Sequence, residues 1–218
     1  MEARASSTPK QQLTRRSLGH GVRVLCEADP DLAGIVSSFG PPPLWGRRPG
    51  YATLVRIILE QQVSLASANA VYKRLRVALG EVTPLNVAAI AARDLCQWGF
   101  TRQKAEYCHE IATLIVTGQF DLRAVAQGDD ATAHQALVSL RGVGPWTADI
   151  YLLMALRRPN IWPIGDLALA EATRRVKRLR HRPSDELLST IASHWHPFRS
   201  VAARILWHLY LQQGSATK

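Results

Sequence analysis

The sequence is poor in cysteine, in acidic residues and in long apolar runs, and each shortage argues against a class of protein. Its three cysteines, Cys26, Cys96 and Cys108, are odd in number and widely spaced, which argues against a disulfide framework and against a zinc or iron–sulfur site. No apolar run reaches the length of a membrane-spanning helix. Residues 1–16 lack the apolar core of a secretory signal. We expect them to form a flexible basic arm, with a transit peptide as the alternative.

The charge balance favours a polyanionic partner. The chain has 27 Lys and Arg residues against 17 Asp and Glu residues, a formal net charge of +10. Nucleic acid is the first candidate partner of so basic a protein, and an acidic membrane surface is the second. The 218 residues, 47% of them hydrophobic, suffice for one large domain or two small lobes. The few cysteines suit a reducing compartment, the bacterial cytoplasm and nucleoid or a eukaryotic nucleus.

Strand signals are nearly absent, so the expected fold class is all-α with about ten helices. Residues 39–50 contain four prolines and predict a loop between an N-terminal helix and the main body. Thr83 and Thr101 each resemble an N-cap residue before a helix. Farther along the chain, the apolar spacing predicts helices over residues 130–140, 146–157, 166–176, 184–194 and 198–213.

Residues 140–150, LRGVGPWTADI, interrupt a helical pattern with two glycines and a proline. Gly142 can adopt a positive φ and close the preceding helix, and Pro145 suits the first turn of the next one. Gly144 has no side chain, so another backbone can approach it closely. The free N–H groups of the turn and of the next helix would point outward together and bind an anion, such as a phosphate. An ordinary turn between helices would also explain two glycines alone.

The same stretch resembles the helix–hairpin–helix motif of the base-excision DNA glycosylases, the HhH-GPD superfamily. At that family's spacing, residues 162–166 read WPIGD, and Asp166 comes twenty residues after Trp146. Further likeness lies in ILEQQVS (58–64), GFTRQKAEY (99–107) and HPFRSVAARILWHLY (196–210), the last resembling the 3-methyladenine DNA glycosylase II branch. The resemblance covers residues from about 51 to 212. It implies a two-lobed helical glycosylase domain over residues 17–218, with the helix–hairpin–helix at about 130–157 and an active-site cleft between the lobes.

Two absences indicate a branch of this family. Bifunctional members carry a lysine after the hairpin that attacks the sugar as an amine, and Trp146 stands at that position here. Some members also carry four cysteines near the C-terminus for an iron–sulfur cluster, whereas the last cysteine here is Cys108. The resemblance therefore implies a monofunctional N-glycosylase with no AP-lyase activity, no iron–sulfur cluster and no required cofactor.

Asp166 is the predicted catalytic residue. Departure of the base leaves positive charge on the deoxyribose, and a carboxylate beside C1′ would stabilise that charge and orient water. The alternative interpretation makes Asp166 the N-cap of the following helix, and the two roles are compatible. We interpret Asp149 as structural rather than as a second catalytic acid, and Glu60 as a weaker alternative acid.

The resemblance also implies an aromatic base pocket. An alkylated purine carries positive charge, and aromatic faces bind such a ring by stacking and cation–π attraction. Trp146 and Trp207 match pocket positions of the family, although both could instead be core tryptophans. Tyr51 is a weaker candidate of the same kind. Tyr151 is displaced by one position from the family's pocket tyrosine, where Ile150 stands.

Enzymes that act on a base in duplex DNA must flip it out and fill the gap. The family's inserted residue corresponds to Gln62, with Gln61 as the second candidate, although both could simply face solvent. Phosphate would be bound by the backbone N–H groups of Gly142, Gly144 and Thr147.

Cations contribute to the expected DNA interface in two ways. The family's hairpin often binds a monovalent cation, Na⁺ or K⁺, through backbone carbonyls that correspond to those of Val138, Leu140 and Val143. Candidate phosphate contacts are Arg102, Lys104, Arg199, Arg204 and the basic run 174–182, for which a solvated helix face is an equally good interpretation.

The expected function is that of a monomeric, monofunctional DNA glycosylase acting on double-stranded DNA with damaged bases. It would release alkylated purines such as 3-methyladenine and 7-methylguanine and leave an abasic site. One alternative is a glycosylase for hypoxanthine, ethenoadenine or an oxidised base. The other is a DNA-binding helix–hairpin–helix module without catalysis, in which Asp166 would be dispensable.

Overall fold

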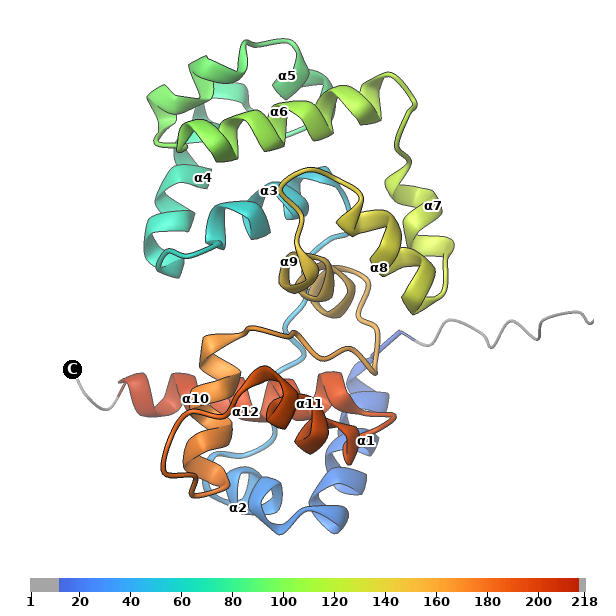
Figure 1. Cartoon of the computed structure of the whole chain (residues 1–218), viewed down its shortest axis with the longest axis vertical. Helices are drawn as coiled ribbons and strands as arrows, with labels where there is room; N and C mark the ends of the chain where they lie inside the picture. The colour runs from blue at the N-terminus through green and yellow to red at the C-terminus, as the bar shows by residue number, and fades with distance from the viewer. Residues whose placement is uncertain (1–11, 216–218) are drawn as a thin grey trace, which may run out of the picture.

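The computed structural model describes residues 12–215, and within that range the chain is built of helices with no strand (Figure 1). The all-α prediction is confirmed, with twelve α-helices among the described residues where about ten were expected. The first six are α1 (Arg15–Ala28), α2 (Pro30–Phe39), α3 (Tyr51–Glu60), α4 (Leu65–Leu79), α5 (Pro84–Ala88) and α6 (Arg102–Val116), with a 3₁₀ segment, η1 (Ala92–Trp98), before α6. The others are α7 (Leu122–Gln127), α8 (Asp130–Val138), α9 (Pro145–Ile150), α10 (Leu167–Val176), α11 (Asp185–Ser193) and α12 (Arg199–Ser215), with a π-helical segment, η2 (Tyr151–Ala155), continuing α9.

Side-chain caps begin many of these helices where the sequence predicts. Thr83 accepts the backbone N–H of Asn86 at the start of α5, and Thr101 accepts that of Lys104 at the start of α6. These hydroxyls satisfy N–H groups that have no partner inside the helix. Proline stands in the first turn of α2, α5 and α9, where its missing N–H is not needed.

The folded body begins earlier than the predicted arm allows. Residues 1–11 of that arm lie outside the described residues. Leu13 is 1% exposed, and its backbone N–H donates to the Arg157 carbonyl at 2.7 Å. Thr14 then caps α1 by accepting the Ser17 N–H. Residues 12–16 therefore belong to the helical body, because Leu13 is buried within it.

Helices α3 to α9 form the upper lobe in Figure 1. Helix α6 packs against α3, α5 and η1, while α8 packs against α7 and α9. The apolar side of α3 supplies much of this core: Leu54, Val55, Ile57 and Ile58 are all fully buried. The upper lobe thus places the α8–α9 hairpin beside the C-terminal end of α3.

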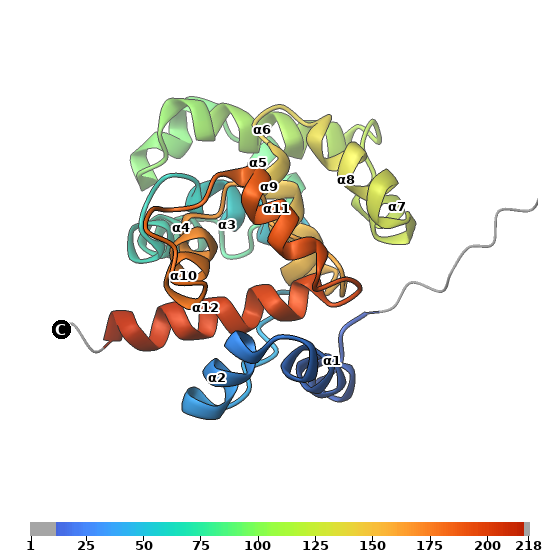
Figure 2. The same cartoon turned by 60° about the horizontal axis from the view of Figure 1, so that its bottom comes forward.

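The lower lobe surrounds α12, which contacts α1, α2, α10 and α11 (Figure 2). Its central residues, Val201 to Ile205, are fully buried. In Figure 2, α1 and α2 lie on one side of α12, while α10 and α11 lie on the other. The two ends of the sequence therefore build one lobe, and residues 51–155 build the other.

The chain crosses between the lobes twice, at residues 40–50 and at residues 156–166 (Figure 1). Arg204 of α12 is 0% exposed, and its guanidinium donates to the carbonyls of Trp45 (3.1 Å), Leu153 (2.9 Å) and Ser200 (3.0 Å). Burial lowers the pKa of Arg204 to about 10. The predicted phosphate contact at Arg204 is wrong, because this side chain joins the first crossing and η2 to α12 inside the protein.

Candidate active site

The hairpin turn, residues 139–144, joins α8 to α9 and depends on Gly142. Its φ is +84°, in the left-handed region that the sequence predicts. A Cβ at Gly142 would overlap the ring of Tyr107 on α6. The Arg141 guanidinium lies 5.3 Å from the centre of the same ring and pairs with Glu106 and Glu110. The turn is thereby packed onto α6.

The outer side of the hairpin turn is open. Gly144 has a φ of −85°, and a Cβ built there meets no atom within 4 Å. Gly144 is the N-cap of α9, and no side chain caps that helix. The N–H groups of the first turn of α9 therefore have no side-chain partner, as a ligand-binding helix start requires.

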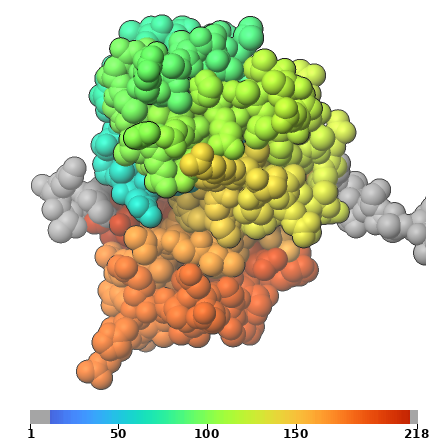
Figure 3. All heavy atoms as spheres, turned by 45° about the horizontal axis from the view of Figure 1, so that its top comes forward, coloured from blue at the N-terminus to red at the C-terminus, as the bar shows by residue number. Residues whose placement is uncertain are grey.

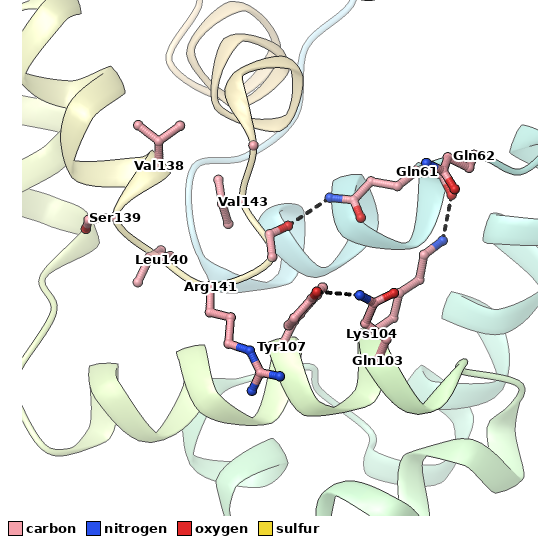
Figure 4. A pocket seen from close by; sticks show the side chains of 12 residues that line it. Gln61, Gln62, Gln103, Lys104, Tyr107, Val138, Ser139, Leu140, Arg141 and Val143 are labelled. Carbon is pink, nitrogen blue, oxygen red and sulfur yellow. Dashed lines mark hydrogen bonds between the residues drawn. The ribbon is translucent and has the colours of Figure 1, made fainter.

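A second turn, residues 61–64 between α3 and α4, is joined to the hairpin turn through Gln61 (Figure 4). The Gln61 side-chain amide donates to the Gly142 carbonyl and to the Thr147 hydroxyl, both at 2.9 Å. Gln61 is thus a structural link between α3 and α9, a role that the sequence did not reveal. Gln62 is exposed and has a φ of +57°, a conformation that is unfavourable for a residue with a side chain.

Lys104 of α6 fixes the end of α3. Its ammonium group donates to the carbonyls of Leu59 at 2.9 Å and Gln61 at 2.7 Å (Figure 4). Desolvation lowers the pKa of this lysine. Lys104 therefore supports the turn that carries Gln62 with two hydrogen bonds from its ammonium group.

A hollow of about 600 Å³ lies between α6, the turn after α3 and the hairpin turn (Figure 4). Its walls include Gln62, Tyr107 and Gly144. The two turns and Lys104 thus share one surface. Figure 3 shows the upper lobe, in green and yellow, above the orange atoms of α10 and its neighbouring loops.

Asp166 caps α10 and also receives hydrogen bonds from two tryptophans. Its Oδ1 accepts the backbone N–H of Leu169 at 2.9 Å and the indole N–H of Trp207 at 3.2 Å. Its Oδ2 accepts the indole N–H of Trp146 at 3.0 Å. Asp166 is 9% exposed, so three N–H donors fix the orientation of a nearly buried carboxylate.

The three residues come from different elements and are brought together by the fold. Trp146 is half-buried in the first turn of α9, and Trp207 is 8% exposed on α12. The cap interpretation of Asp166 is confirmed. Its carboxylate also lies against the two tryptophans that the sequence singled out for a base pocket.

The two tyrosines lie elsewhere. Tyr51 is 4% exposed, and its hydroxyl donates to the Cys108 carbonyl on α6 at 2.7 Å. Tyr151 is fully buried, and its hydroxyl accepts the Gly50 N–H at 2.9 Å. The Tyr51 hydroxyl joins α3 to α6, and the Tyr151 hydroxyl joins η2 to Gly50, the residue before α3. The structure therefore places Tyr51 in the core of the upper lobe rather than beside Asp166.

Other candidates have partners that limit their roles. Glu60 forms a bidentate pair with Arg47, at 2.8 and 3.0 Å, which occupies its carboxylate. Arg102 is highly exposed and lies 3.2 Å from Glu106. Arg199 is half-buried, and its Nε donates to Asn160.

The basic run 174–182 divides into paired and unpaired residues. Arg174 and Arg175 pair with Glu171 at 2.8 Å, and Lys177 pairs with Asp29 and Asp31 at 2.9 Å. By contrast, no side-chain partner is found among residues 12–215 for three exposed arginines in the loop after α10, which are Arg178, Arg180 and Arg182.

Asp149 on α9, which the sequence analysis interprets as structural, is a buried acid. It is 7% exposed, and burial raises its pKa to about 7. His134 Nε2 of α8 lies 3.6 Å from Oδ1 of Asp149. No comparable signal was visible in the sequence, because an aspartate in a helix is ordinarily solvated.

The described part of the chain shows neither a membrane-length apolar helix nor a cluster of three or more metal-binding side chains. The monovalent cation predicted at the hairpin would need backbone carbonyls instead. Of these, the Leu140 carbonyl accepts the Val143 N–H at 3.0 Å and keeps a second lone pair, so the donor chemistry fits.

Comparison with known proteins gives relatives of similar sequence and fold. A DNA-3-methyladenine glycosylase of Bacillus subtilis is 27% identical over 164 residues, which cover 70% of this chain and 54% of that one. This chain spans a little over half the length of the Bacillus subtilis relatives that it matches, 58% and 54%.

Two solved structures share the fold. The Schizosaccharomyces pombe 3-methyladenine DNA glycosylase, in complex with abasic DNA, matches with a TM-score of 0.76 and 23% identity over 88% of this chain and 95% of that one. The Clostridium acetobutylicum 8-oxoguanine glycosylase/lyase, bound to double-stranded DNA, matches with a TM-score of 0.76 and 18% identity over 90% of this chain and 70% of that one.

The family profile described as HhH-GPD superfamily base excision DNA repair protein matches residues 55–197, which include α8, the hairpin turn, α9 and Asp166. The chain belongs to the HhH-GPD superfamily of base excision DNA repair proteins.

Proposed function

We propose that this protein is a monofunctional DNA glycosylase that hydrolyses the N-glycosidic bond of alkylated purines in double-stranded DNA. The observation that carries the proposal is the Asp166 carboxylate, which two indole N–H groups and a helix start orient in a nearly buried position. The names of the Bacillus subtilis and Schizosaccharomyces pombe relatives support 3-methyladenine as a substrate. We extend the proposal to 7-methylguanine, because both bases carry positive charge.

In the proposed reaction the C1′–N bond breaks and its electron pair leaves with the base. Asp166 stabilises the positive charge that develops on the sugar. Water then adds to C1′ and gives up a proton, so that an abasic site remains. A cationic purine is already a good leaving group, so this scheme needs no strong general acid.

The tryptophans would serve both the carboxylate and the base. Each indole donates one N–H to Asp166. The half-buried ring of Trp146 would offer a face to an electron-poor purine, and the nearly buried Trp207 would support the carboxylate from α12. Trp146 stands where bifunctional relatives have lysine, and an indole cannot form a Schiff base with the sugar. We therefore propose that the protein has no AP-lyase activity.

Duplex DNA would bind on the surface shared by the two turns. The free N–H groups at Gly144 and along the first turn of α9 suit a backbone phosphate, with the cation at the hairpin as a further contact. Exposed Gln62, in its unfavourable conformation, would enter the space left by the flipped base. Arg178, Arg180 and Arg182 supply unpaired positive charge on the lower lobe.

The test uses duplexes that each carry one defined lesion, incubated with the protein and then treated with hot alkali. We expect strand breaks at 3-methyladenine or 7-methylguanine only after alkali. Breaks confined to hypoxanthine, ethenoadenine or an oxidised base would favour the alternative substrates. Binding without release of any base would favour a DNA-binding module, and breaks without alkali would contradict the argument from Trp146.

A further inference from the structure

Three residues other than glycine have a left-handed backbone within the part of the chain that the structure describes. They are Gln62 (φ +57°), Arg157 (φ +53°) and Arg178 (φ +53°). This conformation is unfavourable for a residue with a Cβ, and it is concentrated at functional positions. Arg157 has a structural role, because its carbonyl accepts the Leu13 N–H at 2.7 Å. Gln62 and Arg178 are exposed, so burial of the side chain explains neither conformation.

Arg178 stands at the end of α10 in a position that ordinarily holds glycine. It follows the C-cap residue, Lys177, and its N–H donates to the Arg175 carbonyl at 3.2 Å. The Leu179 N–H donates to the Arg174 carbonyl at 2.8 Å. This pair of bonds closes a helix end only when the residue at position 178 is left-handed. Glycine would close the same turn without strain, so the arginine lowers stability and its side chain needs another explanation.

Two acids hold residues 177–179, which we call the α10 turn, against the start of α2. The Lys177 ammonium group lies 2.9 Å from a carboxylate oxygen of Asp29 and 2.9 Å from one of Asp31. These carboxylates neutralise Lys177 and fix the backbone beside Arg178. The Arg178 guanidinium has no side-chain partner among the residues that the structure describes. The turn is therefore fixed, while the charge at its tip remains available to a ligand.

The α10 turn resembles the turn between α3 and α4 in its construction. In that turn, Lys104 supports the backbone beside exposed, left-handed Gln62, as Lys177 does beside Arg178. Figure 1 and Figure 2 both show α10 on the same side of the molecule as α4, which begins directly after the turn that carries Gln62. Helix α10 runs from its cap, Asp166, to the α10 turn, and its ten residues span about 15 Å, or about four base-pair steps of DNA.

We propose that the α10 turn is a separate DNA-binding site on the lower lobe, in which Arg178 binds a backbone phosphate a few nucleotides from the lesion. A guanidinium can donate two parallel N–H groups to phosphate oxygens. The fixed backbone reduces the conformational freedom that is lost when the side chain binds. The inference rests on the proposed binding of duplex DNA, and it assigns this contact to Arg178 rather than equally to Arg180 and Arg182.

Arg178→Gly separates this role from a structural one, because stability and binding should change in opposite directions. Glycine relieves the unfavourable φ, so Tm should rise by about 3 °C. Loss of the guanidinium should raise the Kd for an abasic-site duplex about fivefold and reduce the slope of log K against log salt by about 0.9. Arg178→Lys keeps both the charge and the unfavourable φ, so neither Tm nor the salt slope should change.

The matched control is Arg180→Ala. Arg180 is also exposed and lies in the same loop, but its backbone is not left-handed. We expect this control to change the Kd for the abasic-site duplex by less than about twofold. The Nε–H signals in NMR spectra test the contact itself: on addition of the duplex, the Arg178 signal should exchange with water at least tenfold more slowly, while the Arg180 signal is unchanged.

Several results would overturn the proposal: a Kd for Arg178→Gly within twofold of the original protein, a lower Tm in that variant, or an equal loss of affinity in Arg180→Ala. Failure of the proposed function gives a different result. If the original protein released no base while Arg178→Gly still bound the duplex more weakly, the catalytic proposal would fail and the α10 turn would remain a DNA-binding site. Normal base release with unchanged binding in Arg178→Gly would remove only this site.

Discussion

At Gly144 and the start of α9 the exposed groups belong to the backbone, whereas around Asp166 most of the groups that meet are side chains. Gly144 and the first turn of α9 present N–H groups with no side chain over them. At Asp166, indoles from α9 and α12 meet a carboxylate from the start of α10. Helix α9 belongs to both regions, since it begins at the hairpin turn and carries Trp146.

This difference predicts that the two regions respond differently to substitution. A site made of backbone N–H groups depends on the space around them, so adding an atom there should weaken binding. A site made of one carboxylate depends on its charge, so removing the charge should stop the reaction while DNA still binds. Each prediction below separates binding from chemistry or from stability.

The largest effect is expected for Asp166→Asn. The amide keeps the N-cap of α10 but loses the negative charge, so we expect single-turnover base release to fall about 1,000-fold, equivalent to about 4 kcal/mol. Binding to abasic-site DNA should change by less than about threefold. Asp121→Asn is the control, because Asp121 is also an N-cap, accepting the Arg123 N–H at the start of α7. Full activity in Asp166→Asn would remove Asp166 from the reaction.

Raising the pH should lower the stability of the protein substantially, because of Asp149. Its pKa in the folded protein is about 7, against an ordinary value of 3.8, so folding favours its protonated form. The free energy of unfolding should therefore fall as pH rises from about 4 to about 7, by up to about 4 kcal/mol. In Asp149→Asn this contribution is absent. Urea unfolding at pH 5 and pH 8 should show the variant gaining relative stability at pH 8, and parallel curves would contradict the expectation.

Alanine substitutions at the two glycines of the hairpin turn should have different effects, mainly on DNA binding at Gly144 and on stability at Gly142. Alanine at Gly144 meets no atom within 4 Å and suits a φ of −85°, so it should cost less than about 1 kcal/mol of stability. It should nevertheless weaken DNA binding about tenfold, because the methyl group occupies the approach of a phosphate. Alanine at Gly142 should instead cost about 3 kcal/mol, because of its positive φ and the Tyr107 ring. Thermal unfolding and DNA titration distinguish the two, and equal destabilisation would contradict this account.

The smallest effect is expected from the unpaired arginines Arg178, Arg180 and Arg182. Replacing them together with alanine should reduce the slope of log K against log salt by roughly 0.9 for each phosphate that the variant no longer neutralises. A control with the same change in charge replaces Arg15, Arg16 and Arg23, which are exposed on α1 across α12 from α11 (Figure 2). Equal slopes in both variants would show that DNA binding depends on the net charge of the protein and not on the position of these arginines.

Local features of the site could be predicted from the sequence, and long-range contacts could not. The positive φ of Gly142 and the capping role of Asp166 depend on neighbouring residues, so local rules sufficed. The bonds from Trp146 and Trp207 to Asp166 span 20 and 41 residues. Apolar spacing shows which side of a helix is buried but not what that side contacts.

Buried polar residues were the main source of error. Arg204 looked like a phosphate contact, because arginine is usually exposed, yet three carbonyls surround it in the core. Gln61 likewise links α3 to the hairpin turn rather than facing solvent. Within the basic run, the pairing of Lys177 depended on the distant acids Asp29 and Asp31, which only the fold brings close.

The central claim is that the Asp166 carboxylate removes the base by hydrolysis, without an amine nucleophile. The most direct test follows both products of one reaction on a duplex with a single 7-methylguanine, by mass spectrometry of the released base and of the DNA strand. We predict free base and an intact strand with a hydrolysed abasic sugar, and neither product with Asp166→Asn. A strand cleaved at the sugar without alkali, or base release that persists in Asp166→Asn, would contradict the claim.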